Sequence, residues 1–195
     1  MKEDSQENLQ DLYHPIFLAI NSKNPMAVKD IIEKDPLALK QTLPESGYTP
    51  ILLAIHFQNL QIINAIIEKD SSVLEQTLPS GTTPIFLAIA SKNPEAVKMI
   101  IEKDSSVLEQ TLPSGISPIF LATLKYCMTS ESNKDKESAI LKIIIQNQFK
   151  ENITEETRGD LEEFFLNKLL LNGLYSKKKL VSISAYLRVF LKKLY

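Results

Sequence analysis

Apolar and polar residues follow one another along the chain in short runs of helical length. After Pro84, seven residues read PIFLAIA, which is enough apolar sequence for a helix of two turns. The preceding Thr83 predicts where this helix begins, because a threonine hydroxyl can cap a free backbone N–H and a proline at the first helical position has none to satisfy. A second helix is predicted after Asn93-Pro94 by the same capping chemistry. Its apolar positions recur three and four residues apart and form one face: Val97, Ile100 and Ile101.

These two helices belong to a unit that repeats along the chain. Residues 68–89 and 102–123 are identical at 19 of 22 positions. The prolines that begin the first helices are spaced by 35, 34 and 34 residues: Pro15, Pro50, Pro84 and Pro118. Between units, the stretch SSVLEQTLPSG contains proline and glycine and predicts an extended loop with a turn. Two short helices cannot bury an apolar face by themselves, so the units are expected to stack into an α-solenoid.

Two motifs of this unit resemble the ankyrin repeat family. Residues 81–88 read GTTPIFLA, similar to the family's G-x-T-P-L-H-x-A, and residues 59–69 read NLQIINAIIEK, similar to its H-L-E-I-V-x-L-L-L-E-x. The resemblance covers roughly residues 13–150 and implies an all-α solenoid of helix–turn–helix repeats whose β-turn fingers project to one side. It also implies that the concave face of the repeats recognises another protein.

The chain departs from the family pattern at two positions of the repeat. Apolar residues replace the histidine of T-P-L-H, which predicts apolar packing where the family has a hydrogen-bonding ring: Phe17, Leu52, Phe86 and Phe120. Aspartates replace the glycine that closes the second helix: Asp35, Asp70 and Asp104. The loop also makes the repeat one residue longer than the family's usual length of about 33. The shape of the fingers is therefore not carried over from the family.

The repeat pattern divides the chain into an extension, four repeats and a cap. The predicted segments are a polar N-terminal extension at 1–12, ankyrin-like repeats at 13–46, 47–80, 81–114 and 115–150, and a helical C-terminal capping segment at 151–195. In repeat four the second helix, 139–145, arrives ten residues late, so a polar insertion near 127–136 is expected to form an exposed loop. The cap is predicted from helical apolar stripes within 159–171 and 180–194, because a terminal unit has one face in water.

Composition places the chain among ordinary globular proteins. Its 195 residues are 44% apolar and 24% charged, which excludes a disordered chain, a collagen-like fibre and a disulfide scaffold. The acidic, polar start MKEDSQENLQ predicts no secretory signal, and the apolar runs are too short to predict a membrane span. The single cysteine cannot form an internal disulfide, which suits a reducing compartment, so we expect a cytoplasmic protein.

Charge is distributed unevenly along the chain. A net charge of −2 argues against general polyanion binding, and no nucleic-acid partner is expected. Residues 174–195 nevertheless hold six basic residues and no acidic ones, which leaves 16 basic and 24 acidic residues, a charge of −8, in the first 173. Two interpretations stay open for this basic end. One is a capping helix whose lysines keep it soluble, and the other is an amphipathic helix that binds a membrane surface.

Residues able to carry catalysis or to hold a metal are few. His14 and His56 have no partner cysteine and no histidine four residues away, so neither has the ligand set of a metal site. Cys127 lies at a predicted helix end without a neighbour that would lower its pKa, and is interpreted as a half-buried structural thiol. Adjacent glutamates such as 155–156 point apart on a helix. We therefore predict no enzymatic activity, no cofactor and no bound metal.

The family resemblance assigns partner contacts to the finger turns and to the ends of the first helices. Carried onto this chain, the predicted partner-binding residues are Glu45, Tyr48, His56, Phe57, Ser80, Thr82, Ala90, Ser91, Ser114, Ile116, Leu124 and Lys125, together with Asn21, Ser22 and Ser46. Repeat two stands out because it has large side chains where repeat three has small ones, and aromatic anchors carry much of the energy of interfaces. Its large residues are Tyr48, His56 and Phe57. The alternative for Phe57 is that it packs under the neighbouring finger.

Together these observations predict a monomeric, non-enzymatic module that binds another protein. The resemblance adds a more specific hypothesis, because short ankyrin proteins of host-associated bacteria are often delivered into the host cell as effectors. The Lys-, Ile- and Asn-rich composition suits an AT-rich genome. The alternative function is that of a peripheral membrane adaptor attached through residues 180–194.

Overall fold

The computed structural model describes residues 14–130 and 134–148. The predicted extension at 1–12 and the predicted cap at 151–195 lie outside the described residues. The described part of the chain is α-helical and contains no strand. The chain divides into two compact units, Met1–Pro118 and Ile119–Tyr195. The described part of the first unit consists of three helix pairs with their connecting loops.

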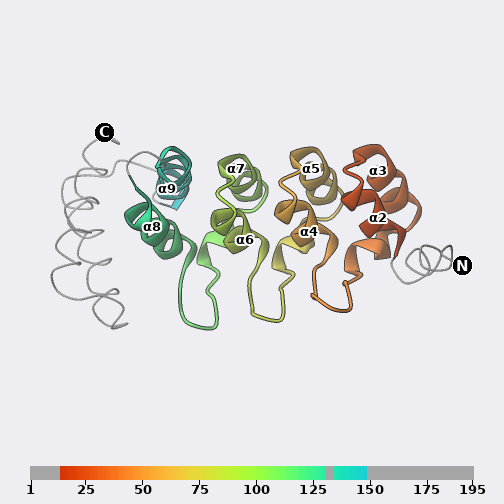
Figure 1. Cartoon of the computed structure of the whole chain (residues 1–195), viewed down its shortest axis with the longest axis horizontal. Coiled ribbons are helices and arrows are strands. Elements are labelled where there is room, and N and C mark those ends of the chain that lie inside the picture. The colour runs from red at the N-terminus through yellow and green to blue at the C-terminus, as the bar shows by residue number, and fades with distance from the viewer. Residues whose placement is uncertain (1–13, 131–133, 149–195) are drawn as a thin grey trace, which may run out of the picture. The chain divides into compact units, whose positions relative to one another are not determined.

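Each repeat of the first unit contains a short inner helix, a longer outer helix and a short 3-10 helix. The inner helices are α2 (Pro15–Asn21), α4 (Pro50–His56) and α6 (Pro84–Ala90), and the outer helices are α3 (Pro25–Lys34), α5 (Leu60–Lys69) and α7 (Pro94–Lys103). The 3-10 helices are η1 (Pro36–Lys40), η2 (Ser71–Glu75) and η3 (Ser105–Glu109). Inner helices lie in one row and outer helices in a second (Figure 1), and neighbours in each row pack together. The all-α solenoid predicted from the repeat is confirmed.

The outer helices begin as the sequence predicts. Asn93 Oδ1 accepts a hydrogen bond from the backbone N of Ala96 at 3.0 Å. The equivalent asparagines, Asn24 and Asn59, accept the same hydrogen bond three residues on, each at 3.1 Å. One free N–H of each outer helix is therefore satisfied by its own cap.

The inner helices begin differently from the prediction. Thr49 and Thr83 precede the first prolines, but neither hydroxyl makes a capping hydrogen bond. Thr83 Oγ1 instead donates to Oε1 of Gln110, which follows η3, at 2.6 Å. His14 stands in the place of threonine and does cap its helix, because its Nδ1 accepts from the backbone N of Ile16 at 3.3 Å. The predicted capping role of these threonines is therefore wrong, and the Thr83 hydroxyl bonds to the loop that follows η3 instead.

The segment SSVLEQTLPSG is only partly the extended loop that was predicted. Its first five residues form η2 in one repeat and η3 in the next. An aspartate ends each outer helix and begins the 3-10 helix: Asp70 Oδ1 accepts from Ser72 N, and Asp104 Oδ1 accepts from Ser106 N, both at 2.9 Å. Hydrogen bonds from the side chain and backbone of Ser72 lower the pKa of the Asp70 carboxyl. The aspartate at the family's glycine position is thus a cap that redirects the chain.

Each 3-10 helix leads into a finger, and a β-turn closes the second and the third. In the second finger Leu78 N donates to Thr82 O at 3.0 Å, and Gly81 N donates to Leu78 O at 2.8 Å. The first finger reads LPESGY against LPSGT in the second, so it contains one extra residue, Glu45. The fingers of the first unit project from the side of the stack on which the inner helices lie (Figure 1). Fingers and inner helices together form the surface that is called the inner face below.

An apolar core joins the repeats of the first unit. At the position of the family's histidine, Phe17, Leu52 and Phe86 are all buried, so the apolar packing predicted there is confirmed. Polar contacts recur across the repeat boundaries: Gln76 Nε2 donates to Leu39 O at 2.9 Å, and Lys69 Nζ lies 3.1 Å from Glu33 Oε2. The periodic sequence therefore produces periodic contacts between neighbouring repeats.

The second unit contains most of α8 (Pro118–Met128) and all of α9 (Asp135–Gln148). Helix α8 begins at the predicted proline but has 11 residues, where each inner helix of the first unit has 7. Helix α9 begins before the predicted range of 139–145. Lys134 was expected in an exposed loop, but it is only 6% exposed and its Nζ lies 4.9 Å from the centre of the Tyr126 ring. That expectation is wrong for Lys134, whose charge lies over the aromatic ring.

Candidate functional site

Three aromatic side chains of repeat two meet on the inner face. The ring centres of Tyr48 and His56 are 5.5 Å apart, and those of His56 and Phe57 are also 5.5 Å apart, both in edge-to-face arrangements. Tyr48 comes from the end of the first finger, His56 is the last residue of α4, and Phe57 is its C-terminal cap. His56 is exposed, and the other two are half-buried. The structure thus brings together the three residues that the sequence marks as large, and they are called the aromatic cluster.

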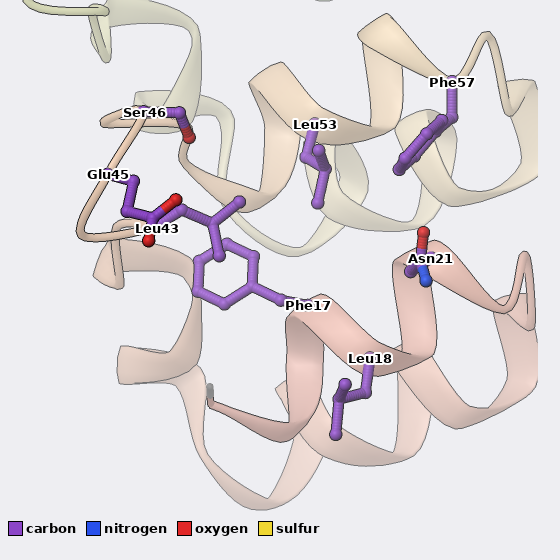
Figure 2. Close-up of a pocket in the computed structure, with 8 residues that line it drawn as sticks. All are labelled: Phe17, Leu18, Asn21, Leu43, Glu45, Ser46, Leu53 and Phe57. Atoms are coloured by element: carbon purple, nitrogen blue, oxygen red, sulfur yellow. The ribbon is translucent and has the colours of Figure 1, made fainter. Parts of the chain in front are cut away.

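A groove adjoins the aromatic cluster and shares Phe57 with it. It encloses about 390 Å³ between α2, the first finger and α4 (Figure 2). Its apolar lining residues are Phe17, Leu18, Leu43, Leu53 and Phe57. Its polar lining residues are Asn21, Glu45 and Ser46. Leu53 of α4 and its C-terminal cap Phe57 both point toward α2 (Figure 2).

Phe57 borders both the groove and the aromatic cluster. The residue is half-buried, and it lies at the end of the groove away from Leu43 and Glu45 of the first finger (Figure 2). Its ring also meets the ring of His56 in an edge-to-face arrangement. The side chain is therefore held in place by its neighbours while part of it still borders the groove.

Most of the other predicted contact residues lie on the inner face outside the groove. Ser80 and Thr82 occupy the second finger with their hydroxyls 2.9 Å apart. Ala90 is exposed, and the Ser91 carbonyl accepts a hydrogen bond from Gln58 Nε2 at 3.3 Å. The remaining residues are Ser22 and Ser114, which are exposed, Ile116, which is half-buried, and Leu124 and Lys125, which are half-buried in the second unit.

Sequence reasoning missed part of the groove. Leu18, Leu43 and Leu53 were not among the candidate residues, although Leu18 is 38% exposed on an otherwise apolar helix. One signal was available in the sequence: the first two prolines of the series are 35 residues apart, where the later ones are 34 apart. The extra residue is Glu45, which the structure places on the groove. The longer first spacing thus indicated that the first finger differs from the later ones.

Candidate chemical groups are sparse in the described part of the chain. Within residues 14–130 and 134–148, no three His, Cys, Asp or Glu side chains are grouped so that they could hold a metal ion. Burial raises the pKa of the Cys127 thiol to about 11, although the charge of Lys134 acts in the opposite direction. Among the helices that the structure describes, none combines the length and apolar character needed to cross a membrane.

The comparison with protein families agrees with this architecture. Residues 16–111 match the family model for ankyrin repeats, in three copies. Residues 16–111 of the chain are therefore ankyrin repeats. A comparison with curated proteins gave no match. Ankyrin repeats are generally non-enzymatic modules that bind other proteins, so the fold assigns the chain to the class of protein-interaction modules.

Proposed function

We propose that this chain is a monomeric, non-enzymatic module that binds its partner protein on the inner face of repeats one and two. The observation that carries the proposal is the aromatic cluster beside the groove. Aromatic side chains gain much contact area with few rotatable bonds, and they dominate interface energies in many complexes. Because Tyr48, His56 and Phe57 already support one another through ring contacts, little freedom is lost when a partner covers them.

The position of the cluster within the repeat supports the proposal further. At the equivalent positions of repeat three the residues are Thr82, Ala90 and Ser91. A partner therefore meets a surface with one anchor region, in repeat two, beside a region with small side chains. Energetically dominant residues of interfaces are typically surrounded by such near-neutral contacts.

The proposal is tested by affinity capture with the full-length chain, followed by a titration of the purified partner. A Tyr48→Ala/Phe57→Ala variant is expected to bind the partner at least about 10-fold more weakly, because each truncated aromatic anchor costs more than about 1 kcal/mol. The matched control is Thr82→Ala/Ser91→Ala, which truncates the equivalent positions of repeat three and is expected to bind like the wild type. Equal loss in both variants, or in neither, would contradict the proposed location.

We also propose that the protein acts in the cytoplasm of a host cell as a delivered effector. Support comes from its ankyrin repeats and from its Lys-, Ile- and Asn-rich composition. The test is a fusion to a reporter enzyme that is active only in eukaryotic cytosol, expressed in the source organism during infection. A reporter signal in host cells is expected. Its absence, with the fusion present in the bacteria, would contradict the effector role.

The alternative function, attachment to a membrane surface, rests on the six basic and zero acidic residues of 174–195. This segment lies outside the described residues. Co-sedimentation with vesicles that contain anionic lipid, using the full chain and a chain ending at residue 173, tests it. Sedimentation of the full chain alone would favour the membrane adaptor.

A further inference from the structure

The first finger has a charged residue that the other fingers lack. Glu45 is the residue inserted between Pro44 and Ser46, and the equivalent turns of the second and third fingers read LPSGT and LPSGI. It is exposed and lines the groove together with apolar residues. The insertion therefore places one carboxylate on the border of an apolar groove.

Glu45 is the main charged residue on the described part of the inner face. Among the described residues of the fingers and inner helices of the first unit, which are 15–22, 42–57, 77–91 and 111–118, it is the single carboxylate, and no Lys or Arg is present. Its carboxylate also makes no hydrogen bond or ion pair within the described part of the chain. A cation on a partner that approaches the groove thus meets the exposed carboxylate of Glu45, and none of the lining residues is a lysine or arginine.

The apolar part of the groove determines which kind of side chain can bind next to that cation. A volume of about 390 Å³ falls at the lower end of the roughly 300–1,000 Å³ typical of ligand pockets, which leaves room for one or two large side chains. Leu18 lies at the α2 side of the groove and is 38% exposed. Burying Leu18 and Phe57 under a partner's apolar side chain would remove apolar surface from water.

We propose that the groove binds a segment of another protein in which a large apolar side chain stands next to a lysine or arginine. The apolar side chain occupies the groove between Leu18 and Phe57, and the basic side chain pairs with Glu45. This inference rests on the proposed function and specifies the chemistry of its partner. The charge also argues against a second copy of this chain as the occupant, because a symmetric pairing of two grooves would bring two Glu45 carboxylates toward each other.

The test uses a random 12-residue peptide library displayed on phage, selected against the immobilised full-length chain. Selected peptides are expected to share a large apolar residue within three positions of a Lys or Arg. The best peptide is then titrated by fluorescence anisotropy. Glu45→Gln is expected to weaken it about fivefold, an effect that shrinks as salt is raised, because the pair lies at a solvent-exposed rim. Selection against Glu45→Lys is expected to replace the basic residue of the motif by Asp or Glu.

The control variant is Glu109→Lys, which makes the same charge change at an exposed residue outside the groove. It is expected to select the wild-type motif. The proposal is overturned if Glu45→Lys selects the same motif as the wild type, or if the motif lacks basic residues, or if no peptide is enriched over a blank support. If Tyr48→Ala/Phe57→Ala loses the selected peptide while Glu45→Lys retains it, the proposed function stands and this inference falls.

Self-association is measured in the same preparation by sedimentation. A wild-type chain that sediments as a monomer supports an occupant from another protein. A wild-type dimer that becomes monomeric in Phe57→Ala would show that a second copy occupies the groove, and would overturn the proposal.

Discussion

Thr83 donates a hydrogen bond of 2.6 Å to Oε1 of Gln110, and Gln110 Nε2 in turn donates to the backbone carbonyl of Leu74 in the preceding repeat, at 3.4 Å. The threonine of the family's T-P motif thus belongs to a bridge between repeats in this chain. The same residue types recur one repeat earlier as Thr49 and Gln76. There, within the described part of the chain, Thr49 Oγ1 and Gln76 Oε1 are buried and have no hydrogen-bond partner.

This difference predicts opposite responses to one substitution. Thr83→Val removes a hydrogen bond and leaves Gln110 Oε1 without its donor, so it is expected to lower the free energy of unfolding by about 1–2 kcal/mol. Thr49→Val replaces a buried hydroxyl that has no partner and is expected to be neutral or stabilising. Urea denaturation of both variants measures the effect. Equal losses in the two would contradict the bridge.

Two equivalent glycines of the fingers, Gly81 and Gly115, allow a second comparison of one substitution at two positions. Both have positive φ, +80° and +76°. A Cβ on Gly81 would lie 2.6 Å from Pro113 Cγ in the next finger, whereas a Cβ on Gly115 would meet no atom of the described residues within 4 Å. Gly115→Ala is expected to cost about 1 kcal/mol for the left-handed backbone alone.

For Gly81→Ala we expect that cost plus about 1–3 kcal/mol for the overlap with the proline ring. Thermal unfolding of both variants compares them directly. A larger loss in Gly115→Ala than in Gly81→Ala would show that the fingers do not depend on this close contact.

A third prediction concerns the turn between inner and outer helix. Lys23 has a φ of 54°, and its equivalents Gln58 and Lys92 have φ of 55° and 53°. Since side chains with a Cβ disfavour this region, Lys23→Gly is expected to stabilise the protein by about 0.5–1 kcal/mol. The control is Lys29→Gly in the middle of α3, which is expected to destabilise by about 1 kcal/mol. Replacing lysine by glycine is thus expected to change the free energy of unfolding in opposite directions at these two exposed positions. Urea denaturation of both variants measures the change, and a shift of both midpoints in the same direction would contradict the prediction.

The large features of this fold could be read from the sequence, and several local ones could not. The proline spacing and the one-sided apolar pattern of 97–101 predict the helix pairs, because stacking repeats need an apolar face at a fixed period. The partners of Thr83 and the 3-10 helix after Asp104 depend on contacts and backbone angles that no periodicity records. The positive φ of Lys23 was equally hidden, because nothing in its residue type favours that conformation.

The candidate site likewise could be predicted from the sequence only in part. Tyr48, His56 and Phe57 could be singled out because they are larger than the residues one repeat later. Their mutual ring contacts could not be predicted, since these depend on how the first finger lies against the end of α4. The groove was missed because Leu18 and Leu53 belong to helical patterns that look like core. Only the structure distinguishes Leu18, which is 38% exposed, from Ile16 and Ile20, which are fully buried.

Cys127 gives a prediction that depends on pH. With a pKa raised to about 11 by burial, the thiol is a reactive thiolate in only about one molecule in a thousand at pH 8, whereas an unperturbed cysteine is ionised near pH 8.5. Labelling of the native protein by a disulfide reagent at pH 8 is therefore expected to be at least about 100-fold slower than in the urea-unfolded chain. The native rate should rise about tenfold per pH unit above 8. A plateau near pH 8.5 would contradict the raised pKa.

Repeat two is expected to hold the partner through its aromatic cluster. The decisive measurement gives repeat two the residues of repeat three, in the variant Tyr48→Thr/His56→Ala/Phe57→Ser, and titrates this variant with the purified partner. These residues already occupy the equivalent positions of a folded repeat, so the unfolding midpoint is expected to stay close to that of the wild type. The dissociation constant of the variant is expected to be at least about 10-fold higher than that of the wild type. A folded variant with unchanged affinity would contradict this expectation.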